Sequence, residues 1–158
     1  MTLDPDSFRA VLGRFASGVT VVTTRDDAGR DAGMTVSAFC SLSLEPPLVL
    51  VCIARDASLH PLLAEGTPFV VNILAAGQEA LSRRFSGPDP NRFDGIGFAR
   101  GLDGVALLDD ALAQLECRVT RLHDGGDHTI CVGRVETATV RPDRPLLYYR
   151  GGYAQLER

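Results

Sequence analysis

The chain has 158 residues, of which 45% are hydrophobic, and its formal net charge is −4, with sixteen basic residues that are all arginine. This length predicts a single domain over residues 1–158 with a sizeable core, and the acidic balance disfavours nucleic-acid binding. No apolar run reaches the roughly 18 residues of a membrane span and no leader peptide is evident, so we expect a cytoplasmic protein without membrane contact.

A short helix is predicted near the start of the chain, over residues 4–18. Asp6 or Ser7 can cap its first turn through a side-chain oxygen, and Gly18 is expected to end it. The apolar residues at helical spacing in this segment are Phe8, Val11, Leu12 and Phe15. They form one face, which is typical of an amphipathic helix.

The segments that follow predict a hairpin, two buried strands and two short helices. Residues 19–39 contain two strand-like stretches around a polar Asp/Gly turn, which predicts a hairpin. The apolar runs 47–54 and 68–76 are typical of buried strands, and the first is continuous enough to predict cover on both faces. Residues 58–66 and 78–87 suit short helices.

The second half of the chain predicts a loop and then more strands. Residues 86–104 are rich in Gly, Pro, Asn and Asp, so we expect an irregular loop. Residues 111–123 and 128–141 flank a Gly-Gly turn and predict a second hairpin, and residues 145–156 predict a last short strand with a tail. Without long helices between the strands, a mainly antiparallel β-barrel with peripheral short helices is favoured over a parallel sheet.

Small residues crowd the stretch that precedes the apolar strand 47–54. Thr35, Ser37, Ala38 and Ser41 would let a flat ligand such as a flavin approach the backbone, and would offer hydroxyl and N–H donors to its edge. The same alternation is also typical of an ordinary half-buried strand. The residues alone leave both interpretations open.

Three further stretches could contact a charged or nucleotide ligand, and each has a plainer interpretation. Arg55 and Ser58 could seat a phosphate at a helix N-terminus, or form only a capped helix with a solvated arginine. His128 leads a strand out of a tight turn and could donate to a second ligand, or simply be exposed. Residues 148–153 could stack a nucleotide ring beside Arg150, or form a strand with a glycine-rich bend.

Several familiar chemical signatures are absent from the sequence. It contains no GxGxxG, P-loop or GxSxG motif and no cluster with metal-ligand spacing, so no metal is expected and nucleophilic or metal-dependent hydrolysis is disfavoured. The four cysteines form no CxxC pair, and each lies in or beside an apolar run. This arrangement predicts small, buried and reduced thiols.

Taken together and in this order, seven segments resemble the short-chain flavin reductases. They are FRAVLGRFASGVTVVTT, GMTVSAFCSLSLEPPLVLVCIARDAS, FVVNIL, RRFSG, FDG, GGDHTICVGRV and PLLYYRGGY, and they run from about residue 5 to residue 155. This family comprises the reductase components of two-component flavin-dependent monooxygenases. The resemblance implies the FMN-binding split-barrel fold, a Greek-key-like antiparallel β-barrel.

The resemblance also implies an NAD(P)H-dependent flavin reductase. A homodimer would reduce FMN or FAD with NADH or NADPH and pass the reduced flavin to a partner monooxygenase. Hydride transfer between two such rings needs no general base, because both molecules bring their own reactivity. Two alternatives are a split-barrel flavoprotein that keeps its flavin and acts on another small substrate, and a non-catalytic flavin-binding module.

Site residues follow from the resemblance by position. The flavin ring and ribityl chain would lie along Met34, Thr35, Val36, Ser37 and Ala38, with Cys40 and Ser41 at the edge. The flavin phosphate would lie near Arg55, Asp56, Ala57 and Ser58, and the site would be closed by Phe85 and Ser86. The nicotinamide nucleotide would meet His128, as a positioning residue, and Tyr149, Arg150, Gly151, Gly152 and Tyr153. Many relatives carry serine or another small polar residue in place of Cys40.

Overall fold

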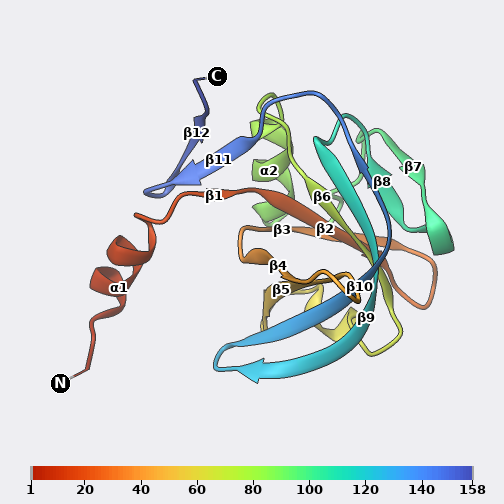
Figure 1. The fold of residues 1–158 in the computed structure, drawn as a ribbon, viewed down its shortest axis with the longest axis horizontal. Coiled ribbons are helices and arrows are strands. Elements are labelled where there is room, and N and C mark those ends of the chain that lie inside the picture. Colours follow the sequence, from red (N-terminus) through yellow and green to blue (C-terminus); the bar gives the residue numbers. More distant parts are fainter. Residues whose placement is uncertain (1, 158) are drawn as a thin grey trace.

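An antiparallel sheet of seven strands forms the centre of the computed structural model, which describes residues 2–157. In chain order its strands are β2 (Thr20–Arg25), β3 (Asp31–Val36), β4 (Phe39–Ser43), β5 (Leu48–Ala54), β6 (Pro68–Ile73), β9 (Ala113–Gly125) and β10 (His128–Val140). Their order across the sheet is β3-β2-β6-β9-β10-β5-β4, and all neighbouring pairs are antiparallel (Figure 1).

The sheet curls into a barrel because a very short link joins its two end strands. β3 and β4 lie at opposite ends of the strand order, yet only Ser37 and Ala38 separate them in the chain. Such a link spans at most about 11 Å, so the two edges must come together. Ala38 in this link already continues the pairing of β4 with β5, because its carbonyl accepts a hydrogen bond from the Cys52 N–H at 2.9 Å. The predicted mainly antiparallel β-barrel with peripheral short helices is confirmed.

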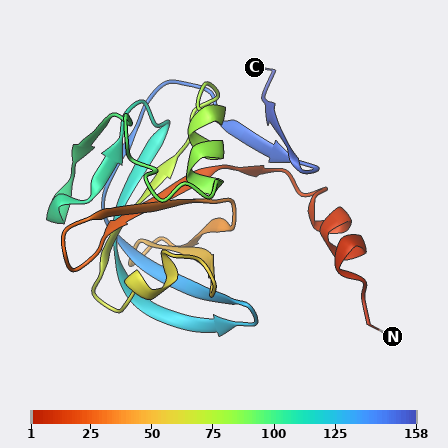
Figure 2. The same ribbon diagram turned by 180° about the vertical axis from the view of Figure 1, so that it is seen from behind.

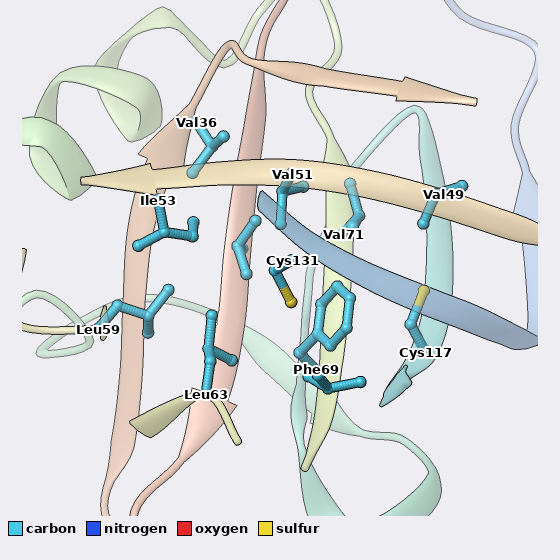
Figure 3. Close-up of a cluster of buried hydrophobic side chains, with 12 residues drawn as sticks. Val36, Val49, Val51, Ile53, Leu59, Leu63, Phe69, Val71, Cys117 and Cys131 are labelled. Atoms are coloured by element: carbon cyan, nitrogen blue, oxygen red, sulfur yellow. The ribbon is translucent and has the colours of Figure 1, made fainter. Parts of the chain in front are cut away.

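Apolar side chains fill the interior of the barrel (Figure 3). On β5 the alternate residues Val49, Val51 and Ile53 are buried, whereas the residues between them are only half-buried. Within one chain the strand is therefore fully covered on one face only, and cover on both faces stays a prediction. A strand of a closed barrel presents only one face to the core, and the other face of β5 is partly open to solvent.

Close packing at the barrel centre requires a glycine at position 133. A Cβ atom at Gly133 would lie 2.4 Å from Cζ of Phe69, a ring that is itself only 1% exposed. The register between β9 and β10 also shifts between Val132 and Gly133, which marks a β-bulge. Gly133 thus makes room for the Phe69 ring, the one aromatic ring among the buried residues of the core cluster in Figure 3.

The N-terminal helix α1 (Pro5–Leu12) forms as predicted but has a different cap. Asp4 is the N-cap residue, and its side-chain Oδ2 accepts a hydrogen bond from the Ser7 N–H at 3.0 Å. The predicted caps, Asp6 and Ser7, lie inside the first turn instead. Pro5 explains the shift, because proline has no N–H to satisfy and its fixed φ suits the first helical position.

The other end of α1 also differs from the prediction. The helix ends at Gly13, five residues before the expected Gly18, which lies in the short strand β1 (Ser17–Gly18). No residue of α1 is buried, and the helix projects away from the barrel in both views (Figures 1 and 2). Within residues 2–157 no helix is both long and apolar enough to cross a membrane.

Two connecting segments differ from the sequence prediction. The helix expected over residues 58–66 is only a single 3-10 turn, η1 (His60–Leu62), and the residues on either side of it are not helical. The segment 86–104, expected to be irregular, contains two short elements. These are the strand β7 (Phe98–Arg100) and the 3-10 turn η2 (Leu102–Gly104).

The remaining elements flank the barrel. Strand β7 pairs with β8 (Ala106–Leu108), and the predicted short helix near residue 80 is α2 (Glu79–Ser86). The chain ends in a hairpin of β11 (Leu146–Tyr149) and β12 (Gly152–Gln155), where a single strand and a tail were predicted. This hairpin forms a separate three-stranded sheet with β1, next to α2 (Figure 1).

Candidate functional site

A cleft lies between the outer face of β3 and helix α2, and we call it the β3–α2 cleft. It consists of two adjoining cavities of about 240 and 180 Å³ that share Thr35 and Ser86. The larger cavity is further lined by Val19, Ser37, Ser82, Tyr148 and Tyr153. The smaller cavity is further lined by Met34, Ala57, Ser58, Phe85 and Arg92. The cleft therefore combines apolar walls with five serine and threonine side chains and one cation.

Alternation along β3 decides which side chains face the cleft. Val36 points into the barrel core and is 4% exposed, so its neighbours Thr35 and Ser37 point outwards. Thr35 also holds the opposite wall in place, because its Oγ1 donates a hydrogen bond to the Ser82 carbonyl oxygen at 2.7 Å. The small residues of the predicted cradle thus form one wall of the cleft, and Val36 can contribute to it only through its backbone.

Helix α2 approaches β3 closely because β3 carries a glycine. A Cβ atom at Gly33 would lie 2.9 Å from Cε1 of Phe85. Phe85 is fully buried and packs edge-on against Phe93, with ring centroids 5.1 Å apart. Ser86 follows at the end of the helix and is exposed where the two cavities meet. Phe85 and Ser86 therefore both line the cleft, and their part in closing a flavin site stays a prediction.

Two tyrosines of the terminal hairpin form the far wall of the larger cavity. The Tyr153 hydroxyl hydrogen-bonds to Ser82 Oγ at 2.7 Å, which ties β12 to α2. The Tyr153 ring meets the Tyr148 ring edge-on at a centroid distance of 5.5 Å, and the Arg83 guanidinium carbon lies 4.9 Å from the Tyr153 centroid. These contacts fix an aromatic surface against which a flat ring can pack.

Arg92 supplies a fixed positive charge at the narrow end of the cleft. Its Nη1 donates to the Gly33 carbonyl at 2.8 Å and its Nη2 to the Gly87 carbonyl at 2.7 Å. These bonds use two of the five N–H groups of the guanidinium, and no carboxylate among residues 2–157 forms an ion pair with it. Arg92 and Ser58 line both the smaller cavity and the next hollow along β3. The pair is suited to an anionic group such as a phosphate.

Arg55, predicted to seat a phosphate, lies on a different cavity. Its Nη2 forms an ion pair with Asp124 at 2.7 Å, and its Nε donates to the Gly126 carbonyl at 3.0 Å. The cavity that it lines, of about 220 Å³, also includes His60 and Thr129, whose side chains are hydrogen-bonded at 2.8 Å. Arg55 therefore lines a different cavity from Ser58, and a flavin contact of Arg55 stays a prediction.

His128 lies at the tip of the β9–β10 hairpin, in register with Ala54 at the end of β5. Its Nδ1 hydrogen-bonds to the exposed Asp127 carboxylate at 2.7 Å, and this bond lowers the pKa of Asp127. No hydrogen bond among residues 2–157 joins His128 to a side chain that lines the β3–α2 cleft. Its role toward a nicotinamide nucleotide stays a prediction.

Other predicted contacts lie just outside the cleft. Ala38, Cys40 and Ser41 follow the strand switch into β4, where Cys40 is in register with Leu50 of β5. Asp56 is exposed in the turn after β5. In the terminal hairpin, Tyr148 faces the cleft and Tyr149 does not, because neighbouring residues of a strand point to opposite sides. The turn residues Arg150 and Gly151 border a separate groove, and Gly152 begins β12.

The cysteines do not all match the prediction of buried thiols. Cys117 and Cys131 are buried in the core, and desolvation raises the pKa of each thiol to about 12. Cys52 is half-buried. Desolvation is the main cause that raises the pKa of its thiol, and the nearby Cys40 is the second. Cys40 is exposed, so for this residue the prediction was wrong. It lies on the edge strand β4 next to Phe39, which packs against the core, so the side chain of Cys40 points to the opposite face.

The cleft includes three side chains that the sequence did not indicate: Val19, Ser82 and Arg92. Arg92 lies in the Gly- and Pro-rich stretch that leads into FDG, between Asn91 and Phe93. Its neighbours in the sequence form no pattern that would indicate a ligand contact. Ser82 lies one helical turn before Phe85 and Ser86, so the helical period of α2 would have placed it on the same face.

A closed antiparallel barrel with a hydroxyl-lined cleft, an aromatic wall and an arginine free of ion pairs among the described residues is suited to bind a flat, phosphorylated ring. The comparison with protein families agrees, since the model of the flavin reductase like domain matches residues 12–157. The chain belongs to the flavin reductase like domain family.

Individual relatives cover almost the whole chain. The reductase subunit of a flavin-dependent monooxygenase from Rhodococcus jostii is 42% identical over 156 residues, which is 98% of this chain and 80% of the relative. An FMN reductase (NADH) from Agrobacterium fabrum is 43% identical over 152 residues, covering 96% of this chain and 86% of that protein.

Solved structures share the same fold. The NADH:FAD oxidoreductase of Streptomyces globisporus, solved in complex with NAD and FAD fragments, superimposes with a TM-score of 0.90 at 40% identity, covering 99% of this chain and 96% of that one. The flavin reductase component of a bacterial two-component tryptophan halogenase superimposes with a TM-score of 0.88 at 41% identity, covering 97% and 98%.

The residues of the β3–α2 cleft fit a flavin mononucleotide unit. The ring of a flavin is apolar on its faces and polar along one edge, and the cleft offers Tyr148 and Tyr153 as apolar surfaces beside the hydroxyls of Thr35 and Ser37. The phosphate of such a ligand needs a cation, and three N–H groups of Arg92 form no hydrogen bond with any of residues 2–157. The larger cavity thus offers apolar rings and hydroxyls to the flavin ring, and the smaller cavity offers a cation to the phosphate.

Proposed function

We propose that this chain is an NADH-dependent flavin reductase that supplies reduced FMN or FAD to a separate monooxygenase. The observation that carries the proposal is the β3–α2 cleft, which ends at Arg92, in a chain of the flavin reductase like family. The names of the relatives support the same activity, because they include NADH-dependent FMN and FAD reductases and a monooxygenase reductase subunit.

Thr35, Ser37 and the Tyr148–Tyr153 wall would hold the flavin ring, and Ser58 and Arg92 would hold its phosphate. When bound, the flavin supplies the chemistry, since its ring accepts a hydride from a reduced nicotinamide. The residues of the chain orient the ring, exclude water from one face and balance the phosphate charge. No side chain has to carry a proton, which agrees with the lack of a general base in the cleft.

The proposal includes a homodimer, which the exposed apolar face of the N-terminal helix supports. The exposed fractions on this face run from 48% for Phe8 to 69% for Val11, and Phe15, which follows the helix, is 84% exposed. A second copy would cover this face. Gel filtration with light scattering should then give twice the chain mass of 16.9 kDa, and a particle of the single mass would contradict the dimer.

The activity is tested by mixing the purified chain with NADH and following the NADH absorbance with and without FMN, FAD or riboflavin. We expect NADH loss only when a flavin is present, with a lower KM for FMN than for riboflavin because Arg92 contacts the phosphate. A tightly bound flavin that stays with the protein through gel filtration would favour a resident-cofactor flavoprotein. Flavin binding without any NADH or NADPH oxidation would favour a non-catalytic binding module and contradict the proposal.

A further inference from the structure

Cys40 and Cys52 lie on neighbouring strands of the barrel, on the side of the sheet that faces away from the core. In the pairing of β4 with β5, Cys40 is in register with Leu50, two residues before Cys52. Leu50 and Cys52 share one face of β5, because the buried Val51 between them points to the other face. The two cysteines are therefore diagonal neighbours on the outer face.

Two further observations place the two thiols close to each other. The Cys52 N–H donates to the Ala38 carbonyl at 2.9 Å, which continues the pairing of the two strands beyond Cys40. The thiols also interact through space, because the nearby Cys40 is the second cause, after desolvation, that raises the pKa of the Cys52 thiol. Backbone pairing and electrostatics thus agree on the arrangement.

The two thiols differ in exposure. Cys40 is exposed, so a small oxidant in solution can reach its sulfur atom, whereas Cys52 is half-buried and its raised pKa favours the protonated form. The exposed thiol is therefore the first to react, and the second lies where it can close a disulfide bond. Cys117 and Cys131 are buried in the core and out of reach of such an oxidant.

A small movement of β4 is needed before the two sulfur atoms can bond. Diagonal neighbours on antiparallel strands lie roughly 7–8 Å apart between Cα atoms, whereas a disulfide bond spans roughly 4.4–6.8 Å. Strand β4 is the last in the order of the sheet and pairs with β5 alone among the described strands (Figure 1). Its register also shifts between Ser41 and Ser43, so the pairing is irregular directly after Cys40. This edge strand can therefore adjust without breaking the barrel.

We propose that Cys40 and Cys52 form a peroxide-sensitive thiol pair that closes a disulfide bond between β4 and β5. The Cys40 sulfur attacks hydrogen peroxide, which breaks the O–O bond and gives a sulfenic acid, and the released hydroxide takes up the thiol proton to become water. The Cys52 sulfur then attacks the Cys40 sulfur, loses its own proton and displaces the hydroxyl group as a second water. Two thiols and one peroxide thus become one disulfide and two waters.

The source of the oxidant rests on the proposed function. Reduced flavin that meets oxygen before it reaches an oxygenase passes two electrons and two protons to O2, which yields hydrogen peroxide beside the protein. The disulfide would also act on the β3–α2 cleft, because Cys40 follows the cleft residue Ser37 by three residues and Cys52 precedes Ser58 by six. Closure would displace the strand switch, so we expect oxidation to weaken flavin binding and to limit further peroxide production.

Hydrogen peroxide added directly to the purified full chain tests the thiol pair without any need for flavin reduction. Trypsin releases residues 31–55 as one peptide that contains both cysteines, because Arg30 precedes it and Arg55 ends it. After peroxide this peptide should lose two hydrogen atoms and resist alkylation, and dithiothreitol should reverse both changes. The peptides that contain Cys117 and Cys131 are internal controls and should keep their free thiols.

Two serine variants separate the roles of the two cysteines. Cys52→Ser should stop at the sulfenic acid, which dimedone traps on Cys40, and Cys40→Ser should leave Cys52 reduced. Peroxide should weaken FMN binding several-fold in the unaltered chain, reversibly with dithiothreitol, and should not change it in either variant. Two free thiols in peptide 31–55 after peroxide, or oxidation of Cys117 at the same rate, would overturn the thiol pair. An unchanged FMN affinity of the disulfide form would overturn its effect on the cleft.

A second experiment replaces the added peroxide with NADH, FMN and air, with and without catalase. The disulfide should form during turnover, and catalase should suppress it. Turnover that oxidises NADH without closing the disulfide would contradict flavin-derived peroxide as the oxidant. A chain that closes the disulfide with added peroxide but never oxidises NADH would contradict the proposed function and support the thiol pair.

Discussion

Replacing Arg92 with glutamine separates the phosphate contact from the packing of the β3–α2 cleft. The change removes the positive charge and weakens two hydrogen bonds, to the carbonyls of Gly33 and Gly87. Loss of those bonds disturbs the cleft for every flavin, whereas loss of the charge affects only a phosphorylated one. A charge-assisted hydrogen bond contributes about 1.5 to 3 kcal/mol, so FMN affinity should fall about 10- to 150-fold further than riboflavin affinity.

The assay is a fluorescence titration of the protein with FMN and with riboflavin, for the unaltered chain and for each variant. The ratio of the two dissociation constants isolates the phosphate contact, because effects on folding and on the ring site cancel. Arg55→Gln is the matched control, since Arg55 already forms an ion pair with Asp124 on a separate cavity. We expect its ratio to equal that of the unaltered chain.

Two results would refute the reasoning about Arg92. Arg92→Gln could weaken FMN and riboflavin equally, which would give Arg92 a structural role only. Alternatively, Arg55→Gln could alter the ratio while Arg92→Gln leaves it unchanged, which would place the phosphate at Arg55 as the sequence predicted.

Three other predictions concern the core, the hairpin tip and the thiols. Gly133→Ala places a methyl group against Phe69 and should lower the free energy of unfolding in urea by about 1 to 3 kcal/mol. Gly18→Ala is the control, because the space around Gly18 is open and its stability should change little. Equal effects of the two changes would contradict the packing argument. His128→Ala should raise the KM for NADH and leave the FMN dissociation constant unchanged; an equal loss in both would assign His128 to the flavin site or to the fold. Cys40 should react rapidly with a thiol reagent at neutral pH because it is exposed. Cys117 is buried with a pKa of about 12 and should react only when the protein unfolds. A slow reaction of Cys40 in the folded protein would contradict its exposure.

The fold was predictable because its strands carry local patterns. The two hairpins follow from Asp/Gly and Gly-Gly turns between apolar stretches, and β2–β3 and β9–β10 appear where these turns predict them. The strand switch at Ser37 and Ala38 was not predictable in the same way, because it depends on closure of the barrel. The same holds for the N-cap, where Pro5 moves the helix start to Asp4.

The candidate site was predictable on the side of β3 and less so elsewhere. Thr35 and Ser37 face the cleft because strand alternation follows from sequence. Arg92 reaches the cleft only because the loop after α2 folds back over β3, a long-range arrangement without a local pattern. Arg55 looked like a phosphate ligand because it precedes Ser58, but contacts with the distant β9–β10 hairpin determine where its side chain lies.

Anaerobic mixing of the protein with NADH and FMN tests the central claim most directly. The account predicts bleaching of the flavin absorbance, with one FMN reduced for each NADH oxidised, at a rate proportional to protein concentration. Unchanged NADH and flavin absorbance, with FMN and equally with FAD, would contradict it.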